Sequence, residues 1–298
     1  MSKRDIHSQI TNNIITLLER VDMKDYRAPF ASLAEQGLPT NGTTGENYNG
    51  INIPNLWVEQ QVKGFQSAKW ATFKQWLSIG ATVKKGEKAS QIVFFRALEK
   101  TETDDNGKER EFKIPMLKTF SVFNADQVDG YSDPDATKEA GPDLVERVET
   151  VESYCQNTKA EIRHGGSSAY YSLSDDYIQM PHTQAFRDTT FSTATEAYHS
   201  VLLHELTHLT GSKKRLNRDQ VSVKVDKAKY AFEELVAELG AAFMCAKFEI
   251  KQAAREDHAL YIKSWLAALK NDNTFIFKAA AEASKAVQFL DALQPEAE

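Results

Sequence analysis

The sequence predicts an α+β protein of two domains: an N-terminal α+β domain and a mainly helical C-terminal domain with a small β-sheet. The chain has 298 residues, which at roughly 100–200 residues per domain favours two domains. Pro, Gly and Asp concentrate at 129–143, where apolar periodicity vanishes. Strand and helix patterns mix before this segment, whereas helical patterns dominate after it. We therefore place the domains at 1–130 and 144–298, with a linker at 131–143.

The N-terminal half begins with apolar residues at helical spacing, which predict a helix within 3–35. A polar, Gly-rich loop at 38–50 follows, because Gly, Asn and Thr dominate there. The rest of this half is a compact α+β pattern. Its parts are a short apolar run at 51–53, a helical stretch at 70–80, a Lys-rich turn at 84–88, a strand at 91–95, a charged hairpin tip or loop at 99–113 and a strand at 117–124.

The C-terminal half begins with a helix from residue 144, continues through a β-hairpin at 161–181 and is helical to its end. One helix is well delimited. Thr193 and Glu196 have the spacing of a capping box at its start, and Gly211 is expected to take a left-handed conformation just past its end.

Composition restricts the class of protein. No apolar run approaches the roughly 20 residues that span a bilayer, and the polar start lacks the apolar stretch of a signal peptide, so we expect a cytoplasmic protein with no membrane partner. Cys155 and Cys245 are too few and too isolated for disulfides or a Cys-based metal site. We expect both to be reduced thiols in the core. Any metal site must then use His and carboxylates.

Residues 204–208 form an H-E-x-x-H motif. A helix places His204 and His208 one turn apart on one face, so both imidazoles can reach one ion. Glu205 then projects beside the ion, where a carboxylate can accept a proton from water as general base. The H-E-x-x-H pattern alone also fits a buried helix whose two histidines are hydrogen-bonded without a metal. A third ligand is therefore needed to distinguish a metal site from such a helix.

That third ligand is expected on a second helix at 232–248. Glu234 and Glu238 lie on one otherwise small and apolar stripe, where carboxylates are costly to bury unless they are paired or bind metal. They fit the E-x-x-A-[D/E/N] pattern of zinc peptidases, in which Glu234 binds the metal and Glu238 orients a ligand histidine. Glu233 is expected to face solvent. Three protein ligands leave a position for water, as in catalytic zinc sites, and the alternative is an ordinary charged helix.

The ion itself is expected to be one divalent metal per chain. Zn²⁺ is the first choice, and Mn²⁺ or Co²⁺ could replace it because a set of two His and one Glu is not strongly selective. A peptidase site also needs a donor for the developing oxyanion. His258 and Tyr261 are candidates, with plain packing or surface roles as the alternative.

A basic segment stands out in a chain whose formal net charge is -6. Residues 61–98 hold seven Lys or Arg against one acidic residue, Glu87, interleaved with Phe and Trp. This pattern is typical of single-stranded nucleic-acid binding, where cations follow phosphates and aromatic faces stack on bases. The expected DNA-binding residues are Lys63, Lys69, Trp70, Lys74, Lys84, Lys85 and Lys88. The alternative is that the aromatics form core, which we expect for Phe73, Trp76, Phe94 and Phe95.

Together these features resemble the ArdC family of antirestriction proteins of conjugative plasmids, over about residues 8–293. The N-terminal blocks of the resemblance are YNGIN at 48–52, WATFKQW at 70–76, GATVKKGEK at 80–88 and VFNADQ at 122–127. The C-terminal blocks are HGG at 164–166, YYS at 170–172, DYIQMP at 176–181, HELTHLTG at 204–211 and YIKSW at 261–265.

The resemblance implies an N-terminal single-stranded DNA-binding domain joined to a zincin-like metallopeptidase domain. It also implies protection of incoming plasmid DNA from restriction, with a host protein such as a component of a restriction enzyme as peptidase substrate. Two functions stay open. Either the protein is a peptidase delivered through its DNA-binding domain, or it coats single strands and its metal site is structural or autoregulatory. The general base Glu205 favours the enzyme, because a structural ion has no use for one.

Overall fold

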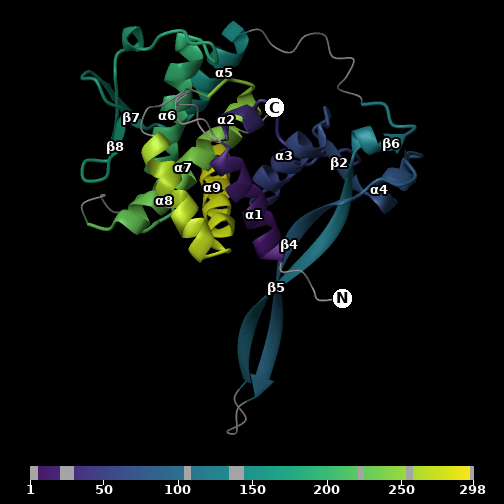
Figure 1. Ribbon diagram of the computed structural model, residues 1–298. Helices are drawn as coiled ribbons and strands as arrows, with labels where there is room; N and C mark the ends of the chain where they lie inside the picture. Colours follow the sequence, from purple (N-terminus) through teal and green to yellow (C-terminus); the bar gives the residue numbers. More distant parts are fainter. Residues whose placement is uncertain are drawn as a thin grey trace.

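A computed structural model describes residues 6–20, 30–103, 109–133, 144–220, 225–252 and 258–295 (Figure 1). It confirms the α+β class. Its α-helices are α1 (Ile6–Glu19), α2 (Ala31–Ala34), α3 (Asn52–Lys63), α4 (Phe73–Ser78), α5 (Leu144–Asn157), α6 (Ala194–Thr210), α7 (Lys227–Phe248), α8 (His258–Asn271) and α9 (Phe275–Asp291). Its strands are β1 (Thr40–Asn41), β2 (Lys69–Thr72), β3 (Thr82–Val83), β4 (Ser90–Thr103), β5 (Glu109–Asn124), β6 (Val128–Asp129), β7 (Glu161–His164), β8 (Tyr170–Ser172) and β9 (Tyr177–Met180).

The main N-terminal sheet has the strand order β1-β2-β5-β4, and β3 pairs with β6 beside it. β4 and β5 form a long antiparallel hairpin that projects from the body of the molecule (Figure 1). The pairing extends from Ser90↔Val122 to Thr103↔Glu109, so most of the segment expected as a hairpin tip is strand, and 104–108 lie outside the described residues.

The predicted helix at 70–80 is shorter than expected. Its first residues belong to strand β2, in which Trp70 and Ala71 are buried against β5. Helix α4 then starts at a capping box, because the Thr72 side chain accepts a hydrogen bond from Gln75 N and the Gln75 side chain accepts one from Thr72 N. Packing against the sheet therefore outweighs the helical periodicity of this segment.

The C-terminal sheet has the order β7-β9-β8. The hairpin predicted at 161–181 is correct for β8 and β9, which pair antiparallel. β7 instead pairs parallel with β9, so the sheet is mixed.

One hydrophobic core joins elements from both halves of the chain. Ile10 and Ile14 of α1 and Trp57 of α3 belong to the same buried cluster as Leu239 of α7 and Trp265 of α8. Figure 1 shows α1, in purple, lying against the helices of the C-terminal half. A fragment that ends near residue 130 would expose the apolar side chains of this shared core. Experiments on the protein therefore require the full chain.

Helices α6 and α7 cross closely, and small residues permit it. The predicted capping box starts α6, since the Thr193 and Glu196 side chains each accept from the other residue's backbone N–H. The left-handed conformation expected of Gly211 is wrong, because its φ is -76°. A Cβ at this position would lie 2.3 Å from Gln220 Nε2, so the flexible end of that side chain would have to move aside. At the crossing, a Cβ on Gly240 would lie 2.6 Å from Thr207 Cγ2.

Other expectations concern the cysteines and the membrane. Cys155 and Cys245 are buried free thiols, as predicted. In the part of the chain that the structure describes, no helix combines the length and apolar character that a bilayer span requires.

The crossing of α6 and α7 leads to a first prediction. Gly240→Ala should destabilise the protein by about 1–3 kcal/mol, because overpacking outweighs the better helix propensity of Ala. Chemical denaturation measures the change. In a Thr207→Ala background, where the two closest atoms are gone and only the Cβ remains at 3.2 Å, the same substitution should cost much less. A stabilised Gly240→Ala single variant would contradict the close crossing.

Candidate metal centre

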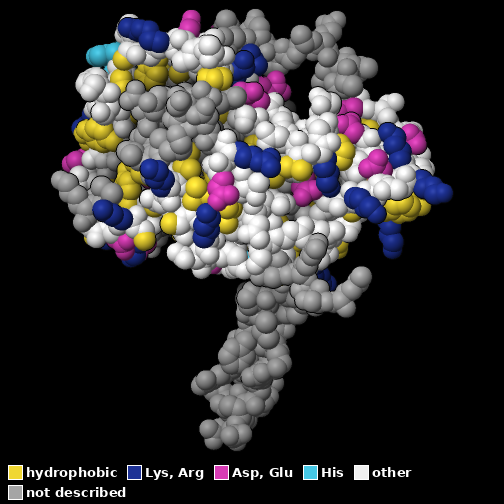
Figure 2. Space-filling view, viewed as in Figure 1, with side chains coloured by type: hydrophobic (Ala, Val, Ile, Leu, Met, Phe, Trp, Pro, Cys, Tyr) yellow, Lys and Arg dark blue, Asp and Glu magenta, His cyan; other side chains and the backbone are white. Residues whose placement is uncertain are grey.

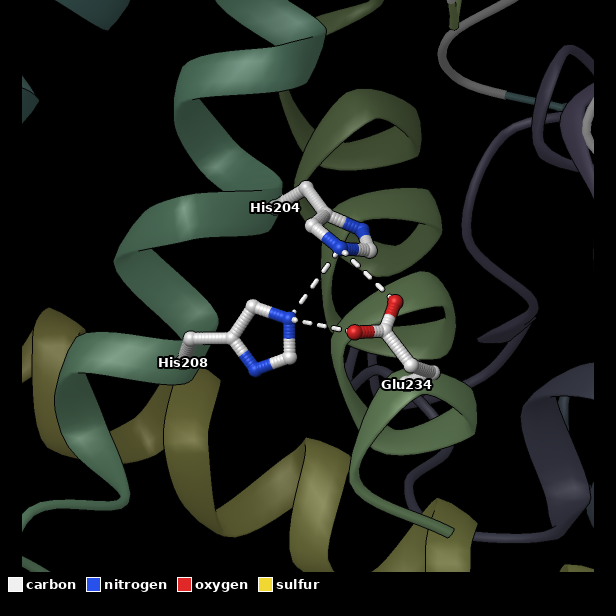
Figure 3. A group of neighbouring side chains, drawn as sticks. All are labelled: His204, His208 and Glu234. Atoms are coloured by element: carbon white, nitrogen blue, oxygen red, sulfur yellow. Dashed lines mark hydrogen bonds and ion pairs between the residues drawn. The ribbon is translucent and has the colours of Figure 1, made fainter. Parts of the chain in front are cut away.

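Helices α6 and α7 bring the predicted ligands together. His204 and His208 lie one turn apart on α6, and Glu234 lies on α7 facing both rings (Figure 3). The two Nε2 atoms are 3.2 Å apart. Glu234 Oε2 lies 3.6 Å from His204 Nε2, and Glu234 Oε1 lies 3.6 Å from His208 Nε2. The ligand atoms of all three residues lie within 4.8 Å of one another.

These separations fit a metal ion. Ligand atoms about 2.0–2.1 Å from a tetrahedral ion are about 3.3–3.4 Å from one another. The distances between the nitrogen and oxygen atoms here, 3.2 and 3.6 Å, bracket that value. The donor set of two imidazoles and one carboxylate also matches catalytic zinc sites. His204, His208 and Glu234 therefore have the donor atoms and the spacing to hold a divalent ion.

Glu238 lies behind His204, as the sequence predicts for an orienting carboxylate. Its Oε2 is 3.9 Å from His204 Nδ1, and its Oε1 accepts a hydrogen bond of 3.2 Å from Gln252 Nε2. Within the described residues, His204 Nδ1 is buried and has no hydrogen-bond partner. Glu238 is thus close to His204 Nδ1, and a small shift of its side chain would bring the two into hydrogen-bond distance.

The expectation that Glu233 faces solvent is wrong. Its side chain is only 8% exposed, and its Oε1 accepts a hydrogen bond of 3.2 Å from His208 Nδ1. Arg218 binds the same carboxylate with two nitrogens, at 2.7 and 2.9 Å. Arg218 also donates to Thr207 O and Thr210 Oγ1, which ties the chain after α6 to the end of that helix. Glu233 therefore orients the second histidine as Glu238 flanks the first.

A sequence signal for Glu233 does exist. Helix α7 is apolar on nearly every side, which is typical of a fully buried helix. In such a helix a carboxylate on any face needs a partner. Only Glu234 and Glu238 fit the zinc-peptidase pattern, which gives the neighbouring Glu233 no role.

The buried carboxylates are kept ionised by their partners. Burial acts to raise the pKa of Glu233, but hydrogen bonds from Arg218 and His208 lower it to about 2. Burial likewise opposes ionisation of Glu234, and His204 and His208 lower its pKa to about 2. For His208, burial lowers the pKa, while the Glu233 hydrogen bond and the charges of Glu234, Glu233 and Glu205 raise it to about 9. The pocket thus favours positive charge at its centre.

Glu205 and a tyrosine complete the surroundings of the ligands. Glu205 is buried on α6, and its charge acts on His208. The Tyr230 hydroxyl lies 3.2 Å from the Tyr261 hydroxyl, and burial and the charge of Glu234 raise the Tyr230 pKa. Tyr261, predicted as an oxyanion donor, therefore reaches the centre through Tyr230, which the sequence analysis missed. The side chain of His258, the other predicted donor, lies outside the described residues.

The predicted DNA-binding residues differ in their exposure to solvent. The exposed ones are Lys63, Lys74, Lys84, Lys85 and Lys88, and Figure 2 shows lysines gathered at the edge of the molecule that contains α4. Lys69 is half-buried. The prediction that Trp70 stacks on bases is wrong. Trp70 is fully buried in β2 and packs edge-on against Phe65. The residue is covered because this segment pairs as a strand and does not start a helix.

The expectation for the other aromatics is also partly wrong. Trp76 is buried as predicted, whereas Phe73, Phe94 and Phe95 are 48%, 55% and 55% exposed. Phe73 lies on α4 with its ring 6.5 Å from that of Phe123, and Phe94 and Phe95 lie on the edge strand β4.

Comparison with known proteins identifies the family. Residues 4–123 match the N-terminal domain of anti-restriction factor ArdC, and residues 149–282 match zincin-like metallopeptidases. The crystal structure of the metal-free antirestriction protein ArdC from plasmid R388 is 37% identical, with a TM-score of 0.75 over 97% of each chain. The chain belongs to the ArdC family of antirestriction proteins.

Other relatives of this ArdC-family chain follow the same pattern. The Mn(II)-bound structure of the R388 protein is 34% identical with a TM-score of 0.70, over 99% of this chain and 100% of that one. The uncharacterized protein y4eC of Sinorhizobium fredii is 37% identical over 99% of this chain and 94% of its own length. A DNA primase TraC of Escherichia coli is 32% identical over 98% of this chain but 27% of its own length.

The Arg218–Glu233 pair leads to a second prediction. Glu233→Ala should cost about 3–5 kcal/mol of unfolding free energy, because it leaves the Arg218 charge buried without its partner. Since the pKa of Glu233 is lowered on folding from 4.5 to about 2, this contribution is present above pH 4.5 and is lost as the pH falls toward 2. Denaturation of metal-free protein at several pH values measures it. The matched control is Glu161→Ala in the exposed Glu161–Arg163 pair, which should change little. An equal effect of both substitutions would contradict the buried pair.

Proposed function

We propose that this ArdC-family protein is a metal-dependent peptidase joined to a single-stranded DNA-binding region, and that it protects incoming DNA from restriction in the cytoplasm. The observation that carries the peptidase is the convergence of His204, His208 and Glu234, with Glu205 next to the first ligand. Zn²⁺ is the expected ion. The Mn(II)-bound R388 structure supports Mn²⁺ as an alternative.

The chemistry follows from the residues around the ligands. A divalent ion held there supplies Lewis acidity, which polarises a peptide carbonyl and lowers the pKa of water. Glu205, directly after His204 on the buried face of α6, accepts the proton of the attacking water and returns it to the leaving amine. The Tyr230 hydroxyl, whose pKa burial and the charge of Glu234 raise, is the donor that stabilises charge on the carbonyl oxygen. Glu233 holds the His208 imidazole in orientation, and Glu238, 3.9 Å from His204 Nδ1, is placed to do the same for His204.

Single-stranded DNA binding rests on different observations. The exposed lysines of 63–88 give the N-terminal half a cationic surface on an acidic protein. The relatives include a protein named as a DNA primase, which supports contact with DNA. The peptidase substrate we propose is a host protein, such as a component of a restriction enzyme, met at the bound strand.

A second candidate function is DNA coating without proteolysis, with a structural or autoregulatory ion. The exposed cationic surface favours it, because that surface needs no metal centre to bind phosphates. Glu205 separates the two candidates.

The third prediction concerns that residue. Glu205→Gln should bind about one ion per chain, as the wild type does, yet lose all peptide-bond cleavage, because an amide cannot accept the proton of water. Elemental analysis gives the metal content, and self-cleavage or casein digestion gives the activity. The control Glu161→Gln changes an exposed carboxylate and should keep both.

Two outcomes would overturn this assignment. Cleavage by Glu205→Gln at the wild-type rate would remove Glu205 as the general base. Full metal content in His204→Ala or His208→Ala would remove the site itself. Antirestriction that survives in Glu205→Gln would favour the coating function instead.

The fourth prediction concerns DNA. The full chain should bind an oligothymidine more tightly than duplex DNA of the same length. If Lys84 and Lys85 contact phosphates, a Lys84→Ala/Lys85→Ala variant should lower the slope of log Kd against log salt by about 1.4, or about 0.7 per contact. The control Lys213→Ala/Lys227→Ala removes two exposed lysines of the C-terminal half and should leave the slope unchanged. Equal affinity for single and double strands would contradict the proposal.

A further inference from the structure

Three exposed phenylalanines lie around one stretch of the β4–β5 hairpin. Phe94 and Phe95 of β4 are each 55% exposed, and Phe120 of β5 is 44% exposed. The strand register pairs Ile92 with Phe120 and Phe94 with Lys118, so Phe94 and Phe120 are diagonal neighbours on one face, with their ring centroids 6.5 Å apart. Phe95 points to the other face, where its ring lies 6.4 Å from that of Phe277 on α9.

A groove of about 460 Å³ lies among these rings, between strand β4 and helix α9. This volume is in the range of small-ligand sites. The groove is lined by Phe94, Phe95, Phe120 and Phe277, with Lys285 and Gln288 of α9 on the opposite side. Its surface thus combines several aromatic rings with amide and ammonium groups.

The charges around the groove favour an anionic ligand. Among the described residues that line it, none is Asp or Glu, and Lys285 is exposed. Lys118, directly across from Phe94, is also exposed. Lys285 pairs with Glu282 at 2.7 Å, but an exposed pair of this kind is weak in water and yields readily to a phosphate.

The edge of the sheet argues against a peptide ligand. β4 is the edge strand, but outward backbone groups of Gln91 and Val93 are already bonded to side chains of α3. Asn52 Nδ2 donates to Val93 O and Val93 N donates to Asn52 Oδ1, at 2.8 and 2.9 Å. Asn55 Nδ2 donates to Gln91 O at 2.8 Å. A peptide strand therefore cannot add to this edge at these residues, and a ligand has to be recognised by the side chains.

We propose that this groove binds unpaired bases of single-stranded DNA. The rings of Phe94, Phe95 and Phe120 stack on bases, and Lys118 and Lys285 contact the adjoining phosphates. The inference rests on the proposed single-stranded DNA binding and deepens it, because it places the bases against α9 of the C-terminal half as well as against the N-terminal sheet.

The test uses fluorescence anisotropy of the full chain with a labelled oligothymidine. Phe94→Ala and Phe120→Ala should each weaken binding about 5- to 150-fold, the loss expected for one stacked base. Phe94→Trp should keep wild-type affinity, whereas Phe94→Leu, apolar but not aromatic, should not. Phe73→Ala is the matched control, since Phe73 is 48% exposed on α4 and outside the groove. Because the substituted rings are exposed, thermal melting of every variant should match the wild type.

A second probe isolates the bases. An oligonucleotide of the same length without bases should bind the wild type more weakly than oligothymidine binds Phe94→Ala, and Phe94→Ala should discriminate between the two probes about 5- to 150-fold less than the wild type does. Discrimination equal to that of the wild type would overturn the proposal.

The remaining outcomes separate this inference from the proposed function. A wild-type chain that binds no single-stranded DNA overturns both. Wild-type binding that is unchanged in Phe94→Ala and Phe120→Ala overturns the groove alone. Affinity retained in Phe94→Leu, with altered self-association of Phe94→Ala in sedimentation, would make the groove a protein interface and would also overturn the proposal.

Discussion

The requirement to neutralise charge buried between α6 and α7 organises the C-terminal half of the protein. Glu196, Glu233, Glu234 and Glu238 are all buried there. A buried carboxylate without a partner is strongly destabilising. Glu196 is satisfied by the start of its own helix and by Lys251 N, and Glu233 is satisfied by Arg218. Glu234 has the imidazoles of His204 and His208 as neighbours, and an ion bound among the three side chains would complete this arrangement.

The other elements hold that interface in place. The small residue Gly240 lets α6 approach α7, and the Arg218–Glu233 pair fixes the chain that follows α6. On the other side of α7, residues from α1, α3, α8 and α9 share its core. The metal centre therefore depends on packing from both ends of the sequence, although all its ligands come from two helices.

The sequence predicts the candidate metal ligands more accurately than it predicts the residues around them. The two His of H-E-x-x-H, and likewise Glu234 and Glu238, follow fixed helical spacing, so local geometry alone places each pair on one stripe of its helix. Glu233 could not be placed in this way, because its partners Arg218 and Gln220 lie in irregular chain with no period. The predictions that Trp70 is accessible and that Phe73, Phe94 and Phe95 are buried were wrong for a related reason. Whether an aromatic residue is buried depends on which element covers it, and for these residues the covering element is distant in sequence.

The shared core of α1 and α3 with the C-terminal helices has a consequence for the integrity of the protein. Side-chain hydrogen bonds add to the apolar contact: Thr11 Oγ1 donates to Asn273 O at 2.7 Å, and Gly50 N donates to Ser284 Oγ at 2.8 Å. A backbone cut between β6 and α5 would break the covalent connection but none of these contacts. The two pieces should then elute together as a noncovalent complex and refold only when mixed.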